Sequence, residues 1–217
     1  MSVGRPGAPG GPRVRLVPGA LEVALAARRC TTWPELAAAV HGCTACAELA
    51  ATRHQVVVGD APAGARLALV GEAPGAEEDA AGRPFVGRAG KLLDELLAAA
   101  GLDRDEVAVL NVLRCRPPAN RTPRPDEVAR CRGWLERSLE LVRPDLVVAL
   151  GLTAAATLLG RGTKLADSRG RVHEVDGRRV LVSYHPSAAI RFGPAGQPRS
   201  ALAADLRLAA TLLGEHR

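Results

Sequence analysis

Short apolar runs recur along the chain and alternate with longer amphipathic stretches. Four of these runs are nearly continuous in aliphatic and β-branched residues, which is typical of strands covered on both faces. A further pair of runs on either side of Asp176-Gly177, Val172–Val175 and Arg178–Leu181, predicts a hairpin leading into the last strand. The four predicted core strands are Arg66–Val70, Val107–Asn111, Asp145–Leu150 and Val180–Ser183.

The stretches between these strands have helical spacing and end at helix-terminating residues. Gly101 and Gly160 follow two of them, and Pro144 follows a third. Because strands and helices alternate, the connections are expected to be right-handed crossovers between parallel strands. The pattern therefore predicts an α/β fold, a three-layer α/β/α sandwich with a central, mainly parallel four-stranded sheet. The predicted helices are Gly87–Ala100, Pro125–Val142, Thr153–Leu159 and Ser200–Leu213.

The N-terminal region differs from the rest in composition. Met1–Pro18 is rich in Gly, Pro and Arg and poor in apolar residues, which predicts a disordered basic tail. Ala20–Arg29 and Trp33–His41 are expected to be helices, the second with Thr32 as its N-cap. We expect residues 19–217 to form a single domain.

Charge and composition narrow the class of protein. The 217 residues carry a net charge of +6 and are 47% hydrophobic, as expected of a globular protein with a polyanionic partner. Almost all basic residues are Arg, since Lys91 and Lys164 are the only lysines, so genome composition is an alternative source of the bias. No apolar run is long enough to cross a bilayer. An odd number of cysteines without a secretory signal points to a reducing cytoplasm.

Four of the five cysteines have the spacing of metal ligands. Cys43 and Cys46 form a CxxC pair, and Cys115 and Cys131 follow far along the chain, whereas Cys30 has no partner at ligand spacing. Thiolates select soft metals, so the candidates are structural zinc and an iron–sulfur cluster, with disulfides as the competing interpretation. Four arginines flank the second pair and suggest phosphate contacts: Arg114, Arg116, Arg130 and Arg132.

Polar residues follow three of the predicted strands. Glu72 lies in the Gly-rich segment after the first strand, Asn111 ends the second, and His185 follows the last. Ligands bind beyond the carboxyl ends of strands in such sheets, so a carboxylate, an amide and an imidazole are expected at one edge. Individually they are also explained as a turn cap, a strand-end turn residue and a loop histidine. Phe85, one of only two Phe residues, lies in a polar loop, where it fits a base-stacking platform or ordinary core packing.

These residues lie in blocks that resemble the family 4 uracil-DNA glycosylases, the iron–sulfur type of bacteria and archaea. Gly71–Asp79 and its continuation through Gly90 look like the family's first signature, the segment from Asn111 through Pro123 is similar to the second, and His185–Arg191 matches the third. The resemblance covers about residues 35–213. It implies a 4Fe–4S cluster held by Cys43, Cys46, Cys115 and Cys131.

The resemblance also implies an activity and residue roles. The enzyme would flip uracil out of single- or double-stranded DNA and hydrolyse its N-glycosidic bond, leaving an abasic site for base excision repair, and would act as a monomer. Glu72 and His185 would be catalytic, with Glu78 and Asp79 as neighbouring carboxylates able to share the role of Glu72. The implied uracil-binding residues are Gly71, Gly75, Phe85, Asn111 and His185, and the implied DNA contacts are Ser187, Ile190, Arg191 and Arg116, with Ile190–Arg191 as a wedge into the vacated stack.

Two alternatives stay open at this point. One is a sister glycosylase. A branch that traps uracil covalently is disfavoured because Pro117–Pro125 lacks its histidine, and a branch of broader base specificity is disfavoured because it lacks a carboxylate where Glu72 stands. The other is a non-catalytic iron–sulfur module that binds DNA.

Overall fold

Five strands pair into one sheet in the order β2-β1-β3-β5-β4 in the computed structural model, which describes residues 17–215. The pairs among β2, β1, β3 and β5 are parallel, as their continuous apolar character predicted. Every residue of β1, β2 and β3 is buried. The strands are β1 (Leu67–Gly71), β2 (Val107–Asn111), β3 (Leu146–Leu150), β4 (Val172–Val175) and β5 (Arg178–Ser183).

The sheet has one strand more than the four-stranded sheet that we predicted. The fifth is β4, which pairs antiparallel with β5 at the edge through the predicted hairpin. Asp176 and Gly177 both adopt positive φ angles, 51° and 74°, as the tight turn between twisted strands requires. The hairpin was therefore correctly predicted, but its first strand extends the main sheet.

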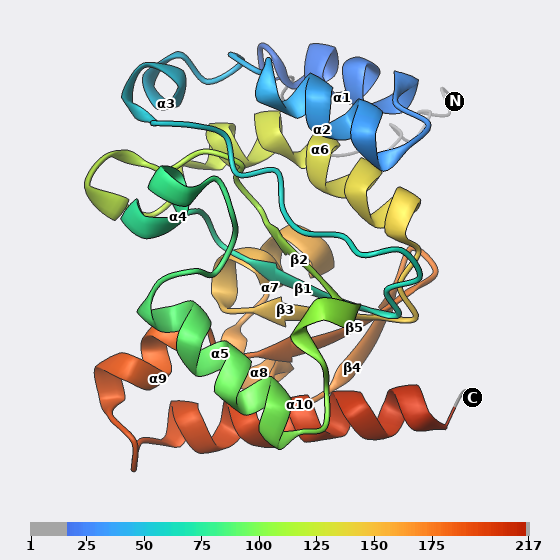
Figure 1. Ribbon diagram of the computed structural model, residues 1–217, viewed down its shortest axis with the longest axis vertical. Coiled ribbons are helices and arrows are strands. Elements are labelled where there is room, and N and C mark those ends of the chain that lie inside the picture. Colours follow the sequence, from blue (N-terminus) through green and yellow to red (C-terminus); the bar gives the residue numbers. More distant parts are fainter. Residues whose placement is uncertain (1–16, 216–217) are drawn as a thin grey trace, which may run out of the picture.

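Helices cover both faces of the sheet (Figure 1). On one face α5, α9 and α10 pack on alternate strand residues such as Leu69 and Val148, and on the other α6 and α7 pack on their neighbours such as Val70 and Val147. α1, α2 and α3 add a third cluster on the outer side of α6. The helices are α1 (Ala20–Arg29), α2 (Trp33–His41), α3 (Ala47–Thr52), α4 (Ala76–Ala81), α5 (Arg88–Ala99), α6 (Pro125–Val142), α7 (Leu152–Leu159), α8 (Leu165–Ser168), α9 (Pro186–Phe192) and α10 (Gln197–Gly214).

All the predicted helices are present, within three residues at each end, whereas four short helices were not predicted. α3, α4, α8 and α9 are four to seven residues long, too short to carry a readable period. The N-cap of α2 is a capping box between Thr32 and Glu35, as its sequence indicated. The predicted tail Met1–Pro18 lies, up to residue 16, outside the described residues.

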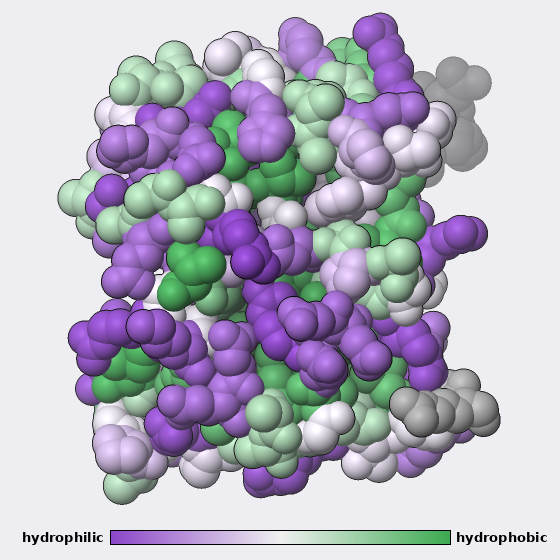
Figure 2. All heavy atoms as spheres, in the orientation of Figure 1, coloured by the Kyte–Doolittle hydropathy of each residue, from purple (hydrophilic) through white to green (hydrophobic). Residues whose placement is uncertain are grey.

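The order of the strands sets the place of the site. β1 lies between β2 and β3, so the connections from its carboxyl end diverge there, the position at which open α/β sheets bind ligands. The segments that follow β1, β3 and β5 lead into α4, α7 and α9 (Figure 1). Figure 2 shows hydrophilic side chains over much of the visible face, with a hydrophobic patch between α4 and α5. Among the described helices none has the length and apolar character of a membrane span.

Candidate active site and cysteine cavity

A cavity opens beyond the carboxyl ends of the strands. Glu72, Phe85, Asn111 and His185, which the sequence placed on different segments, all line it. Gly75 and Ser187 line it too, together with Asn120 and Arg121 from the loop after β2. The expected convergence of a carboxylate, an amide, an imidazole and an aromatic ring is thus present in one cavity.

Phe85 is held in an uncommon backbone conformation. Its φ is 54°, a left-handed value that is an outlier for a bulky residue and is found where surrounding structure fixes it, often at ligand sites. The close approach of Gly90 makes this possible, because a Cβ there would lie 1.7 Å from the Phe85 carbonyl oxygen. The Phe85 ring lies 5.7 Å from the His185 ring, centroid to centroid, at 34°. The two rings therefore flank one end of the cavity.

The Asn111 side chain is buried, 2% exposed, at the end of β2. Its Oδ1 has no hydrogen-bond partner among the described residues, which leaves a buried acceptor on a side chain that lines the cavity. Such an acceptor costs about 1–3 kcal/mol unless a ligand donor meets it. Gly71 does not line the cavity but lies behind it, where a Cβ would come within 2.5 Å of Asn111 Oδ1 and 2.6 Å of the Phe85 ring. Gly71 thus allows the two side chains to approach each other.

The tautomer of His185 follows from its neighbours. The backbone N–H of Ser187 donates to Nδ1 at 3.2 Å, and because that donor cannot accept, Nδ1 carries no proton in the neutral ring. The Ser187 hydroxyl lies 2.8 Å from the same nitrogen. Burial lowers the pKa of His185 to about 4, opposed by the charge of Glu78. The neutral ring therefore presents its Nε2–H as a hydrogen-bond donor.

The depressed pKa predicts how activity depends on pH. Since the folded His185 stays neutral until about pH 4, the rate of the chemical step should show no inflection near the ordinary value of 6.5. In the unfolded chain the same imidazole takes a proton near 6.5, so it lowers stability progressively as the pH falls from 6.5 toward 4. Single-turnover rates between about pH 5 and 8 test this. A step in the rate near 6.5 that disappears in His185→Asn would contradict it.

Three carboxylates lie near the cavity, and two of them are engaged by backbone groups. Glu78 accepts from the N–H groups of Gly75 at 3.0 Å and Gly87 at 2.9 Å, and buried Asp79 accepts from His54 and Gln55 behind the cavity. Glu72 lines the cavity, as Glu78 does, and accepts one hydrogen bond, from the Thr153 hydroxyl. Of the three carboxylates, Glu72 alone accepts no backbone N–H among the hydrogen bonds of the described residues.

Thr153 was not among the residues that we predicted for the site. It lies in the first turn of α7, whose N-terminus also favours a carboxylate electrostatically. The signal was available, because Gly151-Leu152-Thr153 follows β3 just as Glu72 follows β1. The strand order, which places β3 beside β1, was needed to recognise it.

The residues expected to contact DNA lie around the same opening. Ser187 lines the cavity, and Arg116 donates from Nε to Asn120 Oδ1 at 2.7 Å on its rim. Ile190 is half-buried and packs on the core, whereas Arg191 is exposed and Phe192 after it is 65% exposed. The exposed end of α9 is therefore formed by Arg191 and Phe192 more than by Ile190.

The four cysteines with ligand spacing line a second, small cavity between α2, α3 and α6. All five cysteines are free thiols, so the described residues contain no disulfide. Cys30 lies apart, buried in the outer core. No three His, Cys, Asp or Glu side chains of the described chain converge closely enough to hold one metal ion. A tetrahedral zinc would need four sulfurs about 2.3 Å from its centre, and the sulfurs here do not converge in that way.

Nitrogen donors surround the sulfur atoms of this cavity. Arg53 Nη1 lies 3.0 Å from Cys115 Sγ, the backbone N–H of Arg114 lies 3.3 Å from Cys131 Sγ, and Trp134 Nε1 lies 3.4 Å from Cys43 Sγ. Arg130 hydrogen-bonds to Cys46 and opposes the rise that burial causes in the pKa of its thiol. Burial likewise raises the pKa of Cys131 to about 12. The donors suit sulfurs that carry negative charge as metal ligands.

The arginines beside the second cysteine pair differ from our expectation. Arg114 was expected to face phosphate, but it is 2% exposed and lies in the interior, so this interpretation was wrong. Arg130 pairs with Asp126 at 2.7 Å, and Arg132 pairs with Glu136 at 3.4 Å on the surface of α6. Arg114 is therefore buried, whereas Arg130 and Arg132 form ion pairs, because residues near one another in sequence lie on different faces of a helix or loop.

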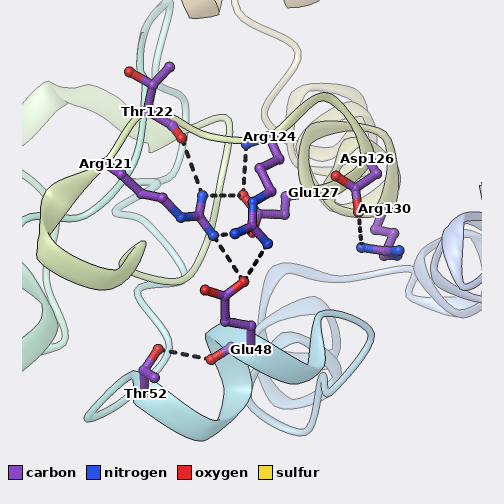
Figure 3. Close-up of polar contacts among 8 residues, drawn as sticks. All are labelled: Glu48, Thr52, Arg121, Thr122, Arg124, Asp126, Glu127 and Arg130. Carbon is purple, nitrogen blue, oxygen red and sulfur yellow. Dashed lines mark hydrogen bonds and ion pairs between the residues drawn. The ribbon is translucent and has the colours of Figure 1, made fainter.

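An ion-pair network joins the segments that carry the cysteines (Figure 3). Arg121 binds Glu127 through both terminal nitrogens, at 2.9 and 2.6 Å, and reaches Glu48 of α3 at 3.4 Å. Arg124 also binds Glu48, and its backbone N–H donates to Glu127 at 2.8 Å. Because Arg121 lines the first cavity as well, the network links the wall of that cavity to α3 and α6.

Removing Arg121 should destabilise the fold. The Glu127 side chain is 4% exposed, and in Arg121→Ala its charge would lose its bidentate partner. Breaking a buried pair costs about 3–5 kcal/mol, and we expect the lower end because Arg121 is a quarter exposed. The matched control is Arg132→Ala, whose exposed pair should contribute under about 1 kcal/mol. Denaturant midpoints of the two variants test this, and equal midpoints would contradict a buried network.

Comparison with known proteins places these features in a family. Residues 58–207 match the uracil DNA glycosylase superfamily, a segment that includes the whole sheet and the first cavity. The type-4 uracil-DNA glycosylase of Thermotoga maritima is 46% identical over 142 residues, 64% of this chain and 73% of that protein. That of Archaeoglobus fulgidus is 47% identical over 134 residues (58% and 67%), and that of Pyrobaculum aerophilum 42% over 147 residues (64% and 75%). The chain therefore belongs to the uracil-DNA glycosylase superfamily, within its type-4 family.

Proposed function

We propose that this uracil-DNA glycosylase binds a flipped uracil in the cavity between Phe85 and Asn111 and hydrolyses its bond to deoxyribose with the help of His185 and Glu72. A base must leave the stack for such chemistry, at a cost of a few kcal/mol that is smallest for mispaired or unpaired bases. Uracil opposite guanine meets this condition. The product is an abasic site in DNA, the substrate of the next steps of base excision repair.

The unpartnered Asn111 Oδ1 carries the assignment of the base. Uracil presents an N3–H donor beside the O4 acceptor, which match the oxygen and the nitrogen of the Asn111 amide. Cytosine presents the reverse pattern and would leave buried groups unpaired, a mismatch that can discriminate by several orders of magnitude. Phe85 would stack on the base, and Gly75 would complete the wall.

His185 and Glu72 would stabilise the two charges that develop as the bond breaks. Negative charge collects on the uracil, and a neutral His185 can donate from Nε2–H to uracil O2 while Ser187 holds the other ring nitrogen. Positive charge collects on the sugar, where Glu72 supplies a carboxylate and positions the attacking water. Thr153 would orient Glu72 through its hydrogen bond.

The DNA would lie across the rim of the cavity. Arg116 and Ser187 supply polar groups beside the opening, and Arg191 supplies a cation at the end of α9. We assign phosphate contacts to these residues and a wedge role to the Ile190–Arg191 turn. We further propose a cytoplasmic monomer that acts on single- or double-stranded DNA, because free thiols suit a reducing compartment.

The cysteine cavity is proposed to hold a 4Fe–4S cluster. Its four thiols support a thiolate-bound metal group, and the lack of convergence of their sulfurs on a single ion position favours a cluster over zinc. When bound, the cluster supplies structural cross-linking, because thiolates fill the ligand positions and none is left for substrate. Cys43, Cys46, Cys115 and Cys131 would thereby tie α2, α3 and α6 to the loop after β2.

Replacing one cluster ligand should remove the metal. In Cys115→Ala we expect loss of most of the iron and a lower unfolding temperature, because metal binding contributes directly to folding. Cys30→Ala, which alters a buried cysteine outside the cavity, should retain iron and serves as the matched control. Iron analysis and visible absorption of anaerobically purified proteins provide the measurement. A Cys115→Ala protein with full iron would contradict the ligand assignment.

The activity is tested on matched duplexes that contain uracil, thymine, cytosine or hypoxanthine at one position. Alkaline strand scission after incubation reports abasic sites. We expect scission at uracil alone. Scission at hypoxanthine as well would indicate the broader-specificity alternative. Absence of scission by protein with full iron would leave the non-catalytic DNA-binding alternative.

A further inference from the structure

Positive charge encloses the cysteine cavity. Besides the four cysteines and apolar residues, its lining contains three arginines, Arg53, Arg114 and Arg130, and no acidic side chain among the described residues. Outside this cavity, by contrast, several arginines, among them Arg66, Arg121 and Arg178, pair directly with carboxylates. Because its only charged side chains are cations, the cavity favours an occupant with net negative charge.

Arg114 is a buried cation without a carboxylate partner among the described residues. It is 2% exposed, and its guanidinium donates only to neutral groups, the Val58 carbonyl at 2.6 Å and the Ser138 hydroxyl at 2.7 Å. Its Nε has no partner, and no ion pair within residues 17–215 includes it. Burying a cation without a counter-charge is strongly unfavourable. Cys131 and Cys115, as metal-bound thiolates, would supply the negative charge that acts on this guanidinium.

Arg53 has a similar position on the other side of the sulfurs. Its Nη1 donates to Cys115 Sγ at 3.0 Å and its Nη2 to the Cys43 carbonyl at 2.8 Å, so both terminal nitrogens serve the ligand segments. The positive charge of Arg130 is partly neutralised, because Asp126 pairs with it. Arg132, which follows Cys131 directly, pairs with Glu136 and does not line the cavity. Arg53 and Arg114 are therefore the two arginines that line the cavity and form no ion pair with a carboxylate among the described residues.

We propose that Arg114 and Arg53 are built-in counter-charges of the cluster and raise its reduction potential. The inference rests on the cluster assigned to the cysteines above. Each electron added to the cluster, from an electrode or chemical reductant, places one more negative charge on the iron, sulfide and thiolate atoms. A fixed cation close by stabilises the reduced form more than the oxidised form, as do N–H donors to the sulfurs. Both effects move the potential in the positive direction.

The test is the midpoint potential of the purified, iron-loaded protein and its variants, measured by film voltammetry. Arg114→Gln and Arg53→Gln remove one positive charge each at similar volume and should shift the potential to more negative values. Arg114→Lys keeps the charge and should stay closer to wild type than Arg114→Gln. Arg132→Gln makes the same charge change one residue from Cys131, outside the cavity, and should leave the potential unchanged.

The outcomes separate this inference from the cluster assignment. Wild-type potentials in both glutamine variants, with full iron, would overturn the counter-charge role while leaving the cluster in place. An equal shift in Arg132→Gln would also overturn it, because the effect would then be one of net charge. If Arg114→Gln does not retain iron, the partly exposed Arg53 position decides the question. Wild-type protein that binds no iron would overturn the cluster assignment and this inference together.

Discussion

In His185→Ala, the single-turnover rate of uracil excision should fall about 10²- to 10³-fold, the usual effect of removing one preorganised donor to a developing anion. Ser187 occupies Nδ1 of the neutral ring, so the proposed donor is Nε2–H, and alanine has no side-chain group that could replace it. Affinity for uracil-containing DNA should change little, because the donor acts mainly on charge that forms in the transition state. Rapid-quench rates and fluorescence anisotropy measure the two quantities.

The matched control is His173→Ala. That imidazole lies on β4, where it contacts the Ser168 carbonyl at 3.0 Å, and it does not line the cavity. We expect wild-type excision from it. A His185→Ala enzyme with the wild-type rate would remove His185 from the mechanism, and a variant that lost rate only through lost DNA binding would make it a binding residue instead.

The second large effect is expected in Asn111→Asp. The carboxylate can still accept from N3–H, but it cannot donate to uracil O4 and its second oxygen repels that atom. We expect the rate on uracil to fall by about 10²-fold or more and the ratio of uracil to cytosine excision to narrow, as for other buried polar mismatches. Single-turnover rates on uracil and cytosine duplexes give the ratio.

Asn120→Asp makes the same chemical change at the only other asparagine in the chain. Its Oδ1 already accepts from Arg116, and it lies on the exposed rim, so the effect should be much smaller. An Asn111→Asp enzyme that excised uracil at the wild-type rate would contradict the role of Asn111 in reading the base edge. Equal losses in both variants would show a general effect of added negative charge.

The sequence predicted the parallel strands and the convergence of Glu72, Asn111 and His185, because strand ends are readable and must meet at one edge of the sheet. It did not predict Thr153, since its relevance depends on β3 lying beside β1 in space. It also misplaced Arg114, because an arginine next to other arginines is normally solvated, and only packing against Val58 and Ser138 revealed its burial.

Other features depend on geometry that has no signature in the sequence. The left-handed backbone of Phe85 is unusual for its residue type and is fixed by the contact with Gly90. A Cβ at Gly71 would come within 2.6 Å of both Asn111 Oδ1 and the Phe85 ring, so the close approach of these side chains depends on this glycine. The division of labour among Glu72, Glu78 and Asp79 follows from which backbone N–H groups reach each carboxylate, and their adjacency in sequence gives no indication of it.

The most direct test of the uracil site is a crystal structure of the protein with free uracil. The base should lie in the cavity against Phe85, with N3–H on Asn111 Oδ1, O4 on the Asn111 amide nitrogen and O2 near His185 Nε2. That arrangement would place the scissile position on the side of Glu72. Uracil bound in the reverse orientation, or outside this cavity while Asn111 Oδ1 remained without a partner, would contradict the proposed mode of recognition.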